Sequence, residues 1–399
     1  MATQASQATD RRDSPNSRWI VMLLENFTYP EDTRVRNEAE SLAGAGHRVV
    51  VLAPRGAGQR SRERLRGVEI RRYRTVWASR SPWSYALEYG IAHLQLFVRS
   101  LAQMLAGART LHVNGPPDTL ALAGFAMRLL GGRVVYDMHD SGPELFEAKF
   151  GSSAALGALR GAQRLAIGCA DHVIVTNQTQ RELVIARAPK RFGGEVTIVR
   201  NGPRAAEFPD PPRARGGRLS SAKLVYVGTL DVQDGVLELP DILSSPKLAD
   251  AHLTIVGDGA ARDELAERCR TLGLQARVTF AGQVPHERVA ALIADADIAL
   301  DPAPATALNH GSTMIKIAEY MGCARPTVAY ELRETMRTAA SAALYAPAGD
   351  LGAFTEAVRR LADDGELRLE LGGLARERAL ELGWERSEQA LRKVYEQLG

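Results

Sequence analysis

Short apolar runs alternate with longer amphipathic segments along most of the chain, beginning at Trp19. Ile20–Glu25 (IVMLLE) has the continuous apolar character of a buried strand, and Thr33–Ala45 has the spacing of a helix. His47–Leu52 (HRVVVL) predicts the next strand, and Gly46 stands where a helix-ending residue is expected. Strands that alternate with helices in this way indicate parallel sheets built from right-handed crossovers.

The same alternation continues to the end of the chain in two similar halves. In the first half, further strands are predicted at Val68–Tyr73, Thr110–Val113, Arg133–Asp137, His172–Thr176 and Val196–Val199. The second half has strand patterns at Lys223–Gly228, Leu253–Val256, Arg277–Ala281, Ile298–Asp301 and Thr327–Tyr330, and helical patterns at Ala261–Leu272, Arg288–Ala294, Met314–Met321 and from Leu351 onward. We therefore expect an α/β chain with two doubly wound, Rossmann-like parallel sheets that face each other across a cleft.

The segment Pro203–Ser221, with four prolines and two glycines, interrupts this alternation and predicts a linker. The expected organisation is a disordered tail over residues 1–18, an N-terminal domain over 19–204, a linker over 205–220, a C-terminal domain over 221–384 and a last helix over 385–399 that returns to the N-terminal domain.

Composition excludes several classes of protein. Among 399 residues, 45% are hydrophobic and 24% are charged, which is ordinary for a globular chain and not for a disordered or collagen-like one. The three cysteines are far apart and have no metal-ligand spacing. The first 18 residues are polar and no apolar stretch is long enough to span a bilayer, so a cytoplasmic protein is expected.

The formal net charge of +3 conceals one strongly basic segment. Arg55–Arg80 contains nine arginines and two glutamates, a local charge of +7. It contains Trp77 and precedes Trp83, Tyr85 and the apolar segment Ala86–Ala106, a combination that suits an anionic membrane surface on the inner face of the membrane. A solvated loop beside a core helix explains the pattern equally well. Because no nucleic-acid motif accompanies the arginines, no nucleic-acid partner is expected.

Cofactor and metal sites are disfavoured. A dinucleotide site needs a glycine-rich turn after the first strand, but Asn26–Arg34 follows that strand and the first glycine of the chain is Gly44. The lone turn Val256–Gly259 is weak evidence for such a site. Asp295 and Asp297 resemble a paired-carboxylate metal site, yet at the end of a predicted helix they are better explained as turn residues. We expect no cofactor and no metal.

Candidate binding chemistry is densest at Asn309–Glu319 (NHGSTMIKIAE). Ser312 or Thr313 is a suitable N-cap for the following helix, whose positive N-terminal end would suit phosphate. Lys316 and Glu319 share one face of that helix, so Lys316 can meet a diphosphate while Glu319 accepts hydrogen bonds from ribose hydroxyls. From spacing alone, an exposed ion pair on a surface helix is an equal alternative.

Nine stretches in a fixed order carry a resemblance to a known family: Asp32–Ala39 (DTRVRNEA), Asn114–Thr119 (NGPPDT), Asp137–Phe150 (DMHDSGPELFEAKF), Val173–Asn177 (VIVTN), Val199–Pro203 (VRNGP), Tyr226–Val236 (YVGTLDVQDGV), Val256–Gly259 (VGDG), Ser312–Pro326 (STMIKIAEYMGCARP) and Leu344–Asp350 (LYAPAGD). The chain resembles the retaining glycosyltransferases of family 4, which have the GT-B fold and use nucleotide-sugar donors. More narrowly, it is similar to a bacterial subgroup that transfers amino sugars or related sugars in surface-polysaccharide assembly.

The resemblance implies a donor site, with a UDP-sugar favoured, in the second domain. Glu319 would hold the nucleotide ribose, Lys316 the diphosphate. The other donor-side candidates are Ser312, Thr313, Gly228 and Thr229 at the phosphates, Val284 and Pro285 beside the base, and Arg200, Gln233, Asp234, Gly235 and Asn309 around them. The sequence departs from the family at Thr229 and Asp234, where many members have a basic residue, and at Gly311, where the first of two glutamates is expected. These departures make a weakly active partner subunit an alternative. An epimerase or hydrolase of the same fold that acts on the same nucleotide sugar is a second alternative.

In the first domain, His139 follows a predicted strand, and the carboxyl ends of such strands border the ligand crevice. By resemblance His139 would approach the donor sugar, and it, Lys316 and Glu319 are the candidate catalytic residues; tying down a loop through Asp137 or Asp140 is the alternative role for His139. Acceptor-side candidates are Asp32, Arg34, Asn114, Asp140 and Glu144. The acceptor would be a saccharide, a polyprenyl-linked sugar or a small molecule. The family is thought to retain configuration by front-face substitution.

Overall fold

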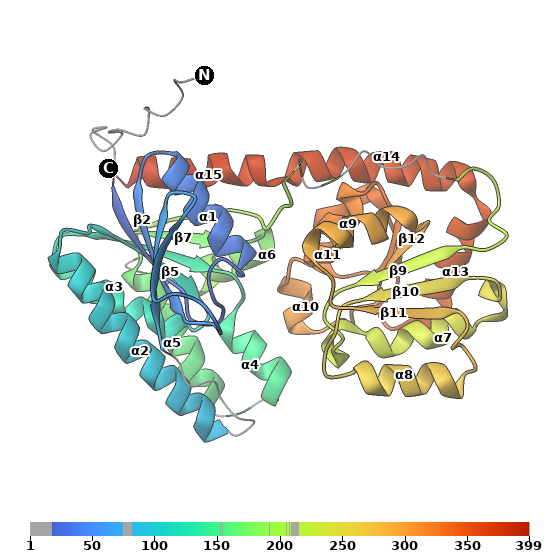
Figure 1. Ribbon diagram of the computed structural model, residues 1–399, viewed down its shortest axis with the longest axis horizontal. Helices are drawn as coiled ribbons and strands as arrows, with labels where there is room; N and C mark the ends of the chain where they lie inside the picture. The colour runs from blue at the N-terminus through green and yellow to red at the C-terminus, as the bar shows by residue number, and fades with distance from the viewer. Residues whose placement is uncertain are drawn as a thin grey trace, which may run out of the picture. The chain divides into compact units, whose positions relative to one another are not determined.

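The computed structural model describes residues 18–74, 82–151, 153, 155–190, 192–204, 206, 208 and 215–398. It divides into two compact units, one made of Met1–Val199 with Glu388–Gly399 and the other of Arg200–Ser387 (Figure 1). Residues 1–17 of the predicted tail and Trp77 in the basic segment lie outside the described residues, as do the side chains of Trp83 and Tyr85.

The first unit is built on an eight-stranded sheet with the order β3-β4-β2-β1-β5-β6-β7-β8. Its strands are β1 (Trp19–Leu23), β2 (Arg48–Pro54), β3 (Arg62–Leu65), β4 (Val68–Tyr73), β5 (Thr110–Gly115), β6 (Arg133–Met138), β7 (His172–Val175) and β8 (Glu195–Ile198). Neighbouring strands are parallel, with β3 and β4 as the exception. Apolar residues fill the central strands, such as β1, β2 and β5, because helices cover both faces of the sheet there, whereas the edge strand β3 is mostly charged.

The helices of the first unit are α1 (Thr33–Gly44), α2 (Pro82–Leu105), α3 (Ala123–Leu129), α4 (Gly142–Phe150), α5 (Ala155–Cys169) and α6 (Gln178–Arg187). Residues of α2, α3 and α5 form one apolar core with alternate strand residues such as Leu111 and Val113. On the opposite face lie α1 and the last residues of the C-terminal helix α15 (Trp384–Gln397), where Tyr395 contacts the β5 residue His112. Helices on both faces make this a doubly wound domain, as expected.

The second unit has six parallel strands with the order β11-β10-β9-β12-β13-β14. The strands are β9 (Lys223–Val227), β10 (His252–Val256), β11 (Val278–Gly282), β12 (Ile298–Asp301), β13 (Thr327–Tyr330) and β14 (Ala343–Ala346). The helices are α7 (Leu239–Ser244), α8 (Arg262–Thr271), α9 (His286–Asp295), α10 (Ala307–Gly311), α11 (Ile315–Gly322), α12 (Arg333–Ala339), α13 (Leu351–Asp363) and α14 (Gly365–Leu382). One core joins the sheet to α7, α8 and α13, and another joins it to α9, α11 and α14 (Figure 1).

The described part of the basic segment, Arg55–Arg74, differs from the solvated loop that was one interpretation of it. Two of its stretches form the antiparallel pair β3–β4 at the edge of the sheet, joined through Arg66 and Gly67, which have φ of 46° and 87°. The arginines at 62 and 64 are partnered across this pair by Arg71 and Glu69. Many of the arginines of this segment therefore lie in two paired strands at the edge of the sheet.

Part of the segment predicted as a linker packs on the second unit. Phe208 is buried against α11 at Gly322, and Arg215 makes a close ion pair with Asp297. Asp297 also accepts a hydrogen bond from the backbone of Lys223 at 2.7 Å, while Asp295 pairs with the Lys223 ammonium at 2.9 Å. Both aspartates thus have turn and ion-pair roles. Across the part of the chain that the structure describes, no helix has the length and apolar character that crossing a membrane requires.

Candidate functional site

Helix α11 is fixed against the sheet of the second unit by the buried hydroxyl of Tyr320. This hydroxyl accepts a hydrogen bond from Val227 N at 2.8 Å and donates one to Leu300 O at 3.2 Å. The first contact reaches β9 and the second β12, which are neighbouring strands. The start of α11 is therefore held beside the carboxyl ends of these strands, where ligands bind in doubly wound domains.

Lys316, in the first turn of α11, is the centre of the residues gathered at this edge. Its ammonium donates to Asp234 Oδ1 at 3.0 Å and to Tyr226 OH at 3.2 Å, and lies 3.4 Å from Asp301 Oδ1. The Lys316 side chain is only 7% exposed. Burial alone lowers its pKa, but the charges of Asp301, Tyr226 and Asp234 outweigh burial and raise the pKa well above the usual value. The alternative of an exposed surface ion pair is therefore wrong.

Close backbone approaches form the rest of this edge. A side chain at Gly235, whose φ is 71°, would place its Cβ 1.9 Å from Pro302 O, and one at Gly257 would be 1.9 Å from Gly228 O. Asn309 Nδ2 donates to Gln233 O at 2.9 Å and so ties α10 to the turn before Gly235. The structure thus brings together six of the predicted donor-side residues: Gly228, Gln233, Asp234, Gly235, Asn309 and Lys316.

The predicted N-cap of the helix that carries Lys316 is wrong. Helix α11 begins at Ile315 and its N-cap is Met314, which makes no side-chain capping bond. Ser312 instead ends the preceding short helix α10, and its hydroxyl donates to Leu308 O at 2.9 Å. Thr313 lies between the two helices, and Glu319 is half-buried one turn after Lys316 on α11.

The remaining donor-side candidates lie around this centre or apart from it. Thr229 is exposed just after β9, and its carbonyl accepts from Tyr226 OH at 3.0 Å. Val284 and Pro285 lie in the turn between β11 and α9. Arg200 lies beside α12 and the start of α15: its backbone N–H donates to Ser387 Oγ at 3.0 Å, and burial lowers the pKa of its guanidinium while Glu334 opposes that shift.

In the first unit, Asp137 is the hub of a buried polar cluster at the end of β6. Arg34 donates to both of its carboxylate oxygens, at 2.8 and 2.6 Å, and also to Val199 O at 2.7 Å. Glu38 Oε1 lies 3.2 Å from the same guanidinium. Burial would raise the pKa of Asp137, but the Arg34 charge and His139 hold it well below its usual range. Arg34, which was predicted to lie on the acceptor side, therefore makes its hydrogen bonds within the buried cluster of the first unit.

His139 lies at the edge of this cluster and is partly exposed, with 19% of its side chain accessible. Its Nε2 contacts Asp137 Oδ2 at 2.7 Å and Asn114 Oδ1 at 3.3 Å. Burial lowers the pKa of His139, but the charge of Asp137 and the hydrogen bond to it raise the pKa by more. Its backbone carbonyl accepts from Gln180 Nε2 at 2.8 Å, so ring and backbone are both fixed.

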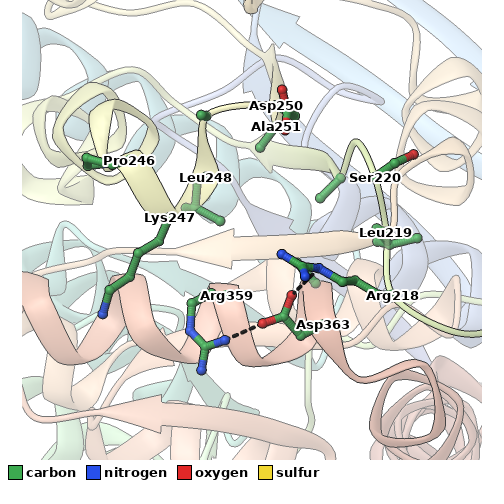
Figure 2. A pocket seen from close by; sticks show the side chains of 13 residues that line it. Arg218, Leu219, Ser220, Pro246, Lys247, Leu248, Asp250, Ala251, Arg359 and Asp363 are labelled. Carbon is green, nitrogen blue, oxygen red and sulfur yellow. Dashed lines mark hydrogen bonds and ion pairs between the residues drawn. The ribbon is translucent and has the colours of Figure 1, made fainter.

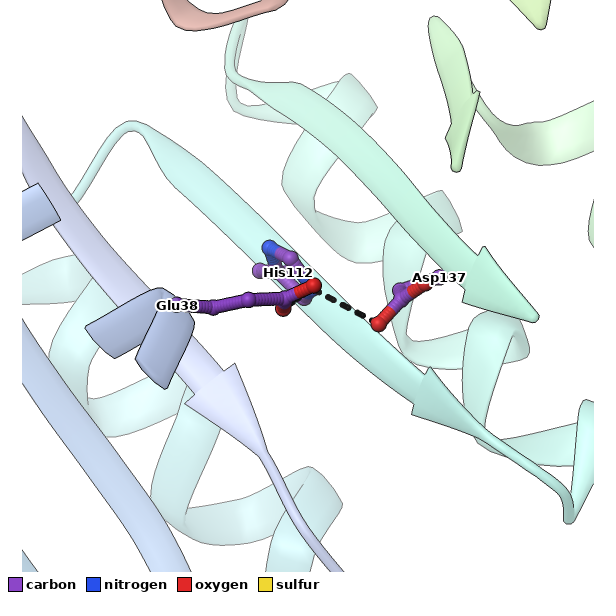
Figure 3. Close-up of side chains that lie close together, drawn as sticks. All are labelled: Glu38, His112 and Asp137. Carbon is purple, nitrogen blue, oxygen red and sulfur yellow. Dashed lines mark ion pairs between the residues drawn. The ribbon is translucent and has the colours of Figure 1, made fainter. Parts of the chain in front are cut away.

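Glu38, His112 and Asp137 lie close enough together to suggest a metal site (Figure 3). His112 Nε2 is 3.3 Å from Glu38 Oε2 and 3.8 Å from Asp137 Oδ2, while its Nδ1 contacts Tyr395 OH at 2.7 Å. Burial lowers the pKa of His112, but hydrogen bonds and charges from Asp137 and Glu38 raise it to about 9. The positive charges of Arg34 and of a protonated His112 balance the negative charges of Glu38 and Asp137. A protonated imidazole cannot bind a metal ion, so Glu38, His112 and Asp137 do not fit a metal site.

The other acceptor-side candidates are also held by neighbours. Asp32 caps α1 by accepting from Val35 N at 2.9 Å, and Asn114 Nδ2 donates to Leu23 O at 2.9 Å. Glu144 makes a close ion pair with Arg187. Asp140 is half-buried next to His139, and burial raises the pKa of its carboxyl.

The second unit has a pocket of about 660 Å³ (Figure 2). It is lined by Ala222 and Ala251, which precede β9 and β10, so it opens at the amino ends of these strands. Arg218 and Arg359 both point to Asp363 across its mouth. Because the carboxyl ends carry Gly228 and Gly257, the pocket is at the opposite edge of the sheet from the candidate donor residues.

Sequence reasoning missed Tyr226, Asp301 and Glu38. Asp301 ends a correctly predicted strand, and that position was a usable signal because charged residues rarely end buried strands without a partner. Tyr226 and Glu38 were missed because the contacts that bring them to these clusters, with Lys316 and with His112, join residues far apart in the sequence.

Two doubly wound units, each with polar residues at the carboxyl ends of its strands, define the GT-B fold. Residues 32–202 match the family model described as a glycosyl transferase 4-like domain, and residues 221–364 match that of the glycosyl transferases group 1. Together the two models span most of the chain, which belongs to the GT-B glycosyltransferases.

Similar proteins of known structure share the fold at low sequence identity. Sucrose-phosphate synthase from Thermosynechococcus elongatus is 19% identical with a TM-score of 0.75, and the match covers 96% of this chain and 99% of that one. HepE of Anabaena, solved in complex with UDP, is 14% identical with a TM-score of 0.68, over 95% of this chain and all of that one.

Similar curated sequences match over shorter stretches. A glycogen synthase of Mycobacterium tuberculosis is 36% identical over 112 residues, 27% of this chain and 26% of that protein. An alpha-D-kanosaminyltransferase of Streptomyces kanamyceticus is 29% identical over 161 residues, 39% of this chain and 40% of that protein. The chain thus matches about a quarter to two fifths of the length of these relatives.

Proposed function

We propose that the protein is a glycosyltransferase that moves a sugar from a nucleotide-sugar donor to an acceptor hydroxyl with retention of anomeric configuration. The observation that carries this proposal is the buried Lys316 at the carboxyl ends of β9 and β12, within the half that matches the group 1 family. A cation and close-packed glycine backbone at that edge suit a diphosphate leaving group.

A UDP-sugar is the favoured donor. HepE, which shares the fold, has been solved in complexes with UDP and with UDP-glucose. An amino sugar is the favoured transferred group, because one similar protein is named a kanosaminyltransferase and another an N-acetyl-D-glucosaminyltransferase of Streptomyces fradiae.

In the proposed reaction, Lys316 stabilises the charge that develops on the leaving diphosphate, and Glu319 orients the ribose. His139 is proposed to contact the donor sugar, and its ring is held through Nε2 by Asp137 and Asn114. The diphosphate accepts the acceptor proton on the face from which it departs, so no side-chain nucleophile is needed. Positioning, charge stabilisation and the exclusion of water then supply the rate acceleration.

The acceptor is proposed to be a saccharide, a polyprenyl-linked sugar or a small molecule, and the basic edge β3–β4 is proposed to lie against an anionic membrane surface. Leu94, Val98 and Leu105 of α2 are exposed in the same unit and would add apolar contacts. Flotation with vesicles of anionic lipid, compared with neutral vesicles and with duplex DNA across a salt series, tests this. Binding to DNA alone, or to no surface, would contradict it.

The reaction is tested by incubating the purified protein with UDP-, GDP- and dTDP-sugars and a panel of acceptors, and by reading the anomeric configuration of the product by NMR. Sugar transfer with an α-linked product from an α-linked donor is expected. In a parallel incubation without acceptor, a free sugar or an isomerised donor as the main product would indicate a hydrolase or an epimerase, and a need for a second protein would indicate a partner subunit.

A further inference from the structure

Lys316 has two carboxylate partners that differ in how firmly they are held. Asp301 belongs to β12 and its side chain is fully buried. Asp234 ends the short turn η3 (Val232–Asp234), is 16% exposed, and is followed by Gly235 in the left-handed conformation. The neighbouring Val232 is 60% exposed. Asp301 is therefore fixed within the sheet, whereas Asp234 lies in a turn at the surface.

The charges around the ammonium leave no attraction for a diphosphate. One ammonium faces the two carboxylates of Asp234 and Asp301, so the group as a whole carries about one negative charge. Tyr226 OH, a third neighbour at 3.2 Å, is already donating to Thr229 O. A diphosphate that reached Lys316 with Asp234 in place would meet this carboxylate at close range, where like charges repel strongly.

We infer that Asp234 occupies the phosphate position on Lys316 and is displaced when the donor binds. The inference rests on the proposed function, because it takes Lys316 to be the diphosphate contact. Asp234 rather than Asp301 is displaced, since the Asp234 side chain is partly exposed and can rotate toward solvent, whereas the Asp301 side chain is fully buried. The consequence is weakened binding of every nucleoside diphosphate, and hence faster release of the spent donor.

The test compares the wild-type protein with Asp234→Asn, a variant of the same shape that lacks the charge. Asp231→Asn is the matched control: Asp231 lies in the same turn and caps it through Val232 N, yet it has no recorded contact with Lys316. Binding of UDP, GDP, dTDP and inorganic pyrophosphate is measured by calorimetry, and thermal unfolding of each variant confirms that it is folded.

Asp234→Asn is expected to bind UDP and pyrophosphate about tenfold more tightly than the wild type, with Asp231→Asn close to the wild type. If the wild type binds a nucleoside diphosphate and Asp234→Asn binds it equally or more weakly, the inference is wrong and the proposed function stands. Equal tightening in Asp231→Asn also overturns the inference, since the effect would be one of overall charge. If no variant binds any of the four probes, both the inference and the proposed function fail.

Discussion

The imidazole of His112 is fully buried, yet it is surrounded by Glu38, Asp137 and Tyr395. Its pKa of about 9 in the folded protein exceeds the ordinary value near 6.5 because the two carboxylates favour the charged ring. A raised pKa contributes stability that is complete below about pH 6.5 and is lost as the pH rises through 9.

We expect His112→Gln to remove this pH dependence. The wild type should lose about 3 kcal/mol of unfolding free energy from His112 between pH 6 and pH 9.5, and the variant should be less stable at pH 6 and change less with pH. Urea unfolding of both proteins at the two pH values measures the difference. Parallel losses in wild type and variant would show that His112 is not charged in the folded state.

His139→Ala and Glu319→Ala should each lower the transfer rate about a hundredfold or more, because each removes a group proposed to contact the bound donor, and both variants are expected to remain folded. His252→Ala and Glu370→Ala, which change exposed residues of the same types, serve as controls. Initial rates are compared with thermal unfolding of the same samples. Unchanged rates in both site variants would contradict the assignment of the site.

At the scale of helices and strands, the chain alone predicted most of what positions the site. The strands Val68–Tyr73, Ile298–Asp301 and Thr327–Tyr330 are confirmed with their predicted bounds. The last two are short, mostly apolar runs buried on both faces, whereas the first begins with apolar residues that alternate with charged ones. The predicted N-cap of α11 was wrong because a short extra helix, α10, precedes it and is capped by Thr306. Such a choice between two nearby caps depends on how the turn packs, which local sequence does not fix.

The contacts of Lys316 illustrate the other limit of prediction. The lysine itself was found from its place on a helix, but Tyr226, Asp234 and Asp301 reach it from β9, from a turn and from β12. These partners are 15 to 90 residues away in the sequence, and only the sheet order brings them together. Strand β3 was missed for a different reason, because its residues Arg62–Leu65 are mostly charged and lack an apolar run.

At the same scale, Tyr320→Phe is expected to loosen α11 from the sheet. Removing the hydroxyl leaves the buried Val227 N and Leu300 O without their partner, at a cost of about 1–3 kcal/mol in unfolding free energy. UDP binding should weaken in the same variant because α11 carries Lys316. Tyr345→Phe removes a hydrogen bond to Ala340 O at an exposed position and should have little effect. Urea unfolding and calorimetry measure the two effects, and equal losses in both variants would contradict the role of Tyr320.

At the scale of the whole molecule, the reaction is expected to need no divalent metal. The cationic groups beside the candidate carboxylates are the side chains Lys316, Arg34 and His112. Transfer rates measured after dialysis against EDTA should remain within about twofold of those with added magnesium or manganese. A large loss that either metal restores would contradict this expectation.

The discontinuity of the first unit also bears on synthesis. Glu388–Gly399 belong to this unit, but the ribosome makes them after the whole of Arg200–Ser387. Until Tyr395 emerges, His112 lacks the hydroxyl that closes its cluster, and the face of the first sheet that carries α1 is not yet covered by the end of α15. The second unit, whose residues are contiguous, can complete its fold before the first. The domain that is translated first is therefore finished last.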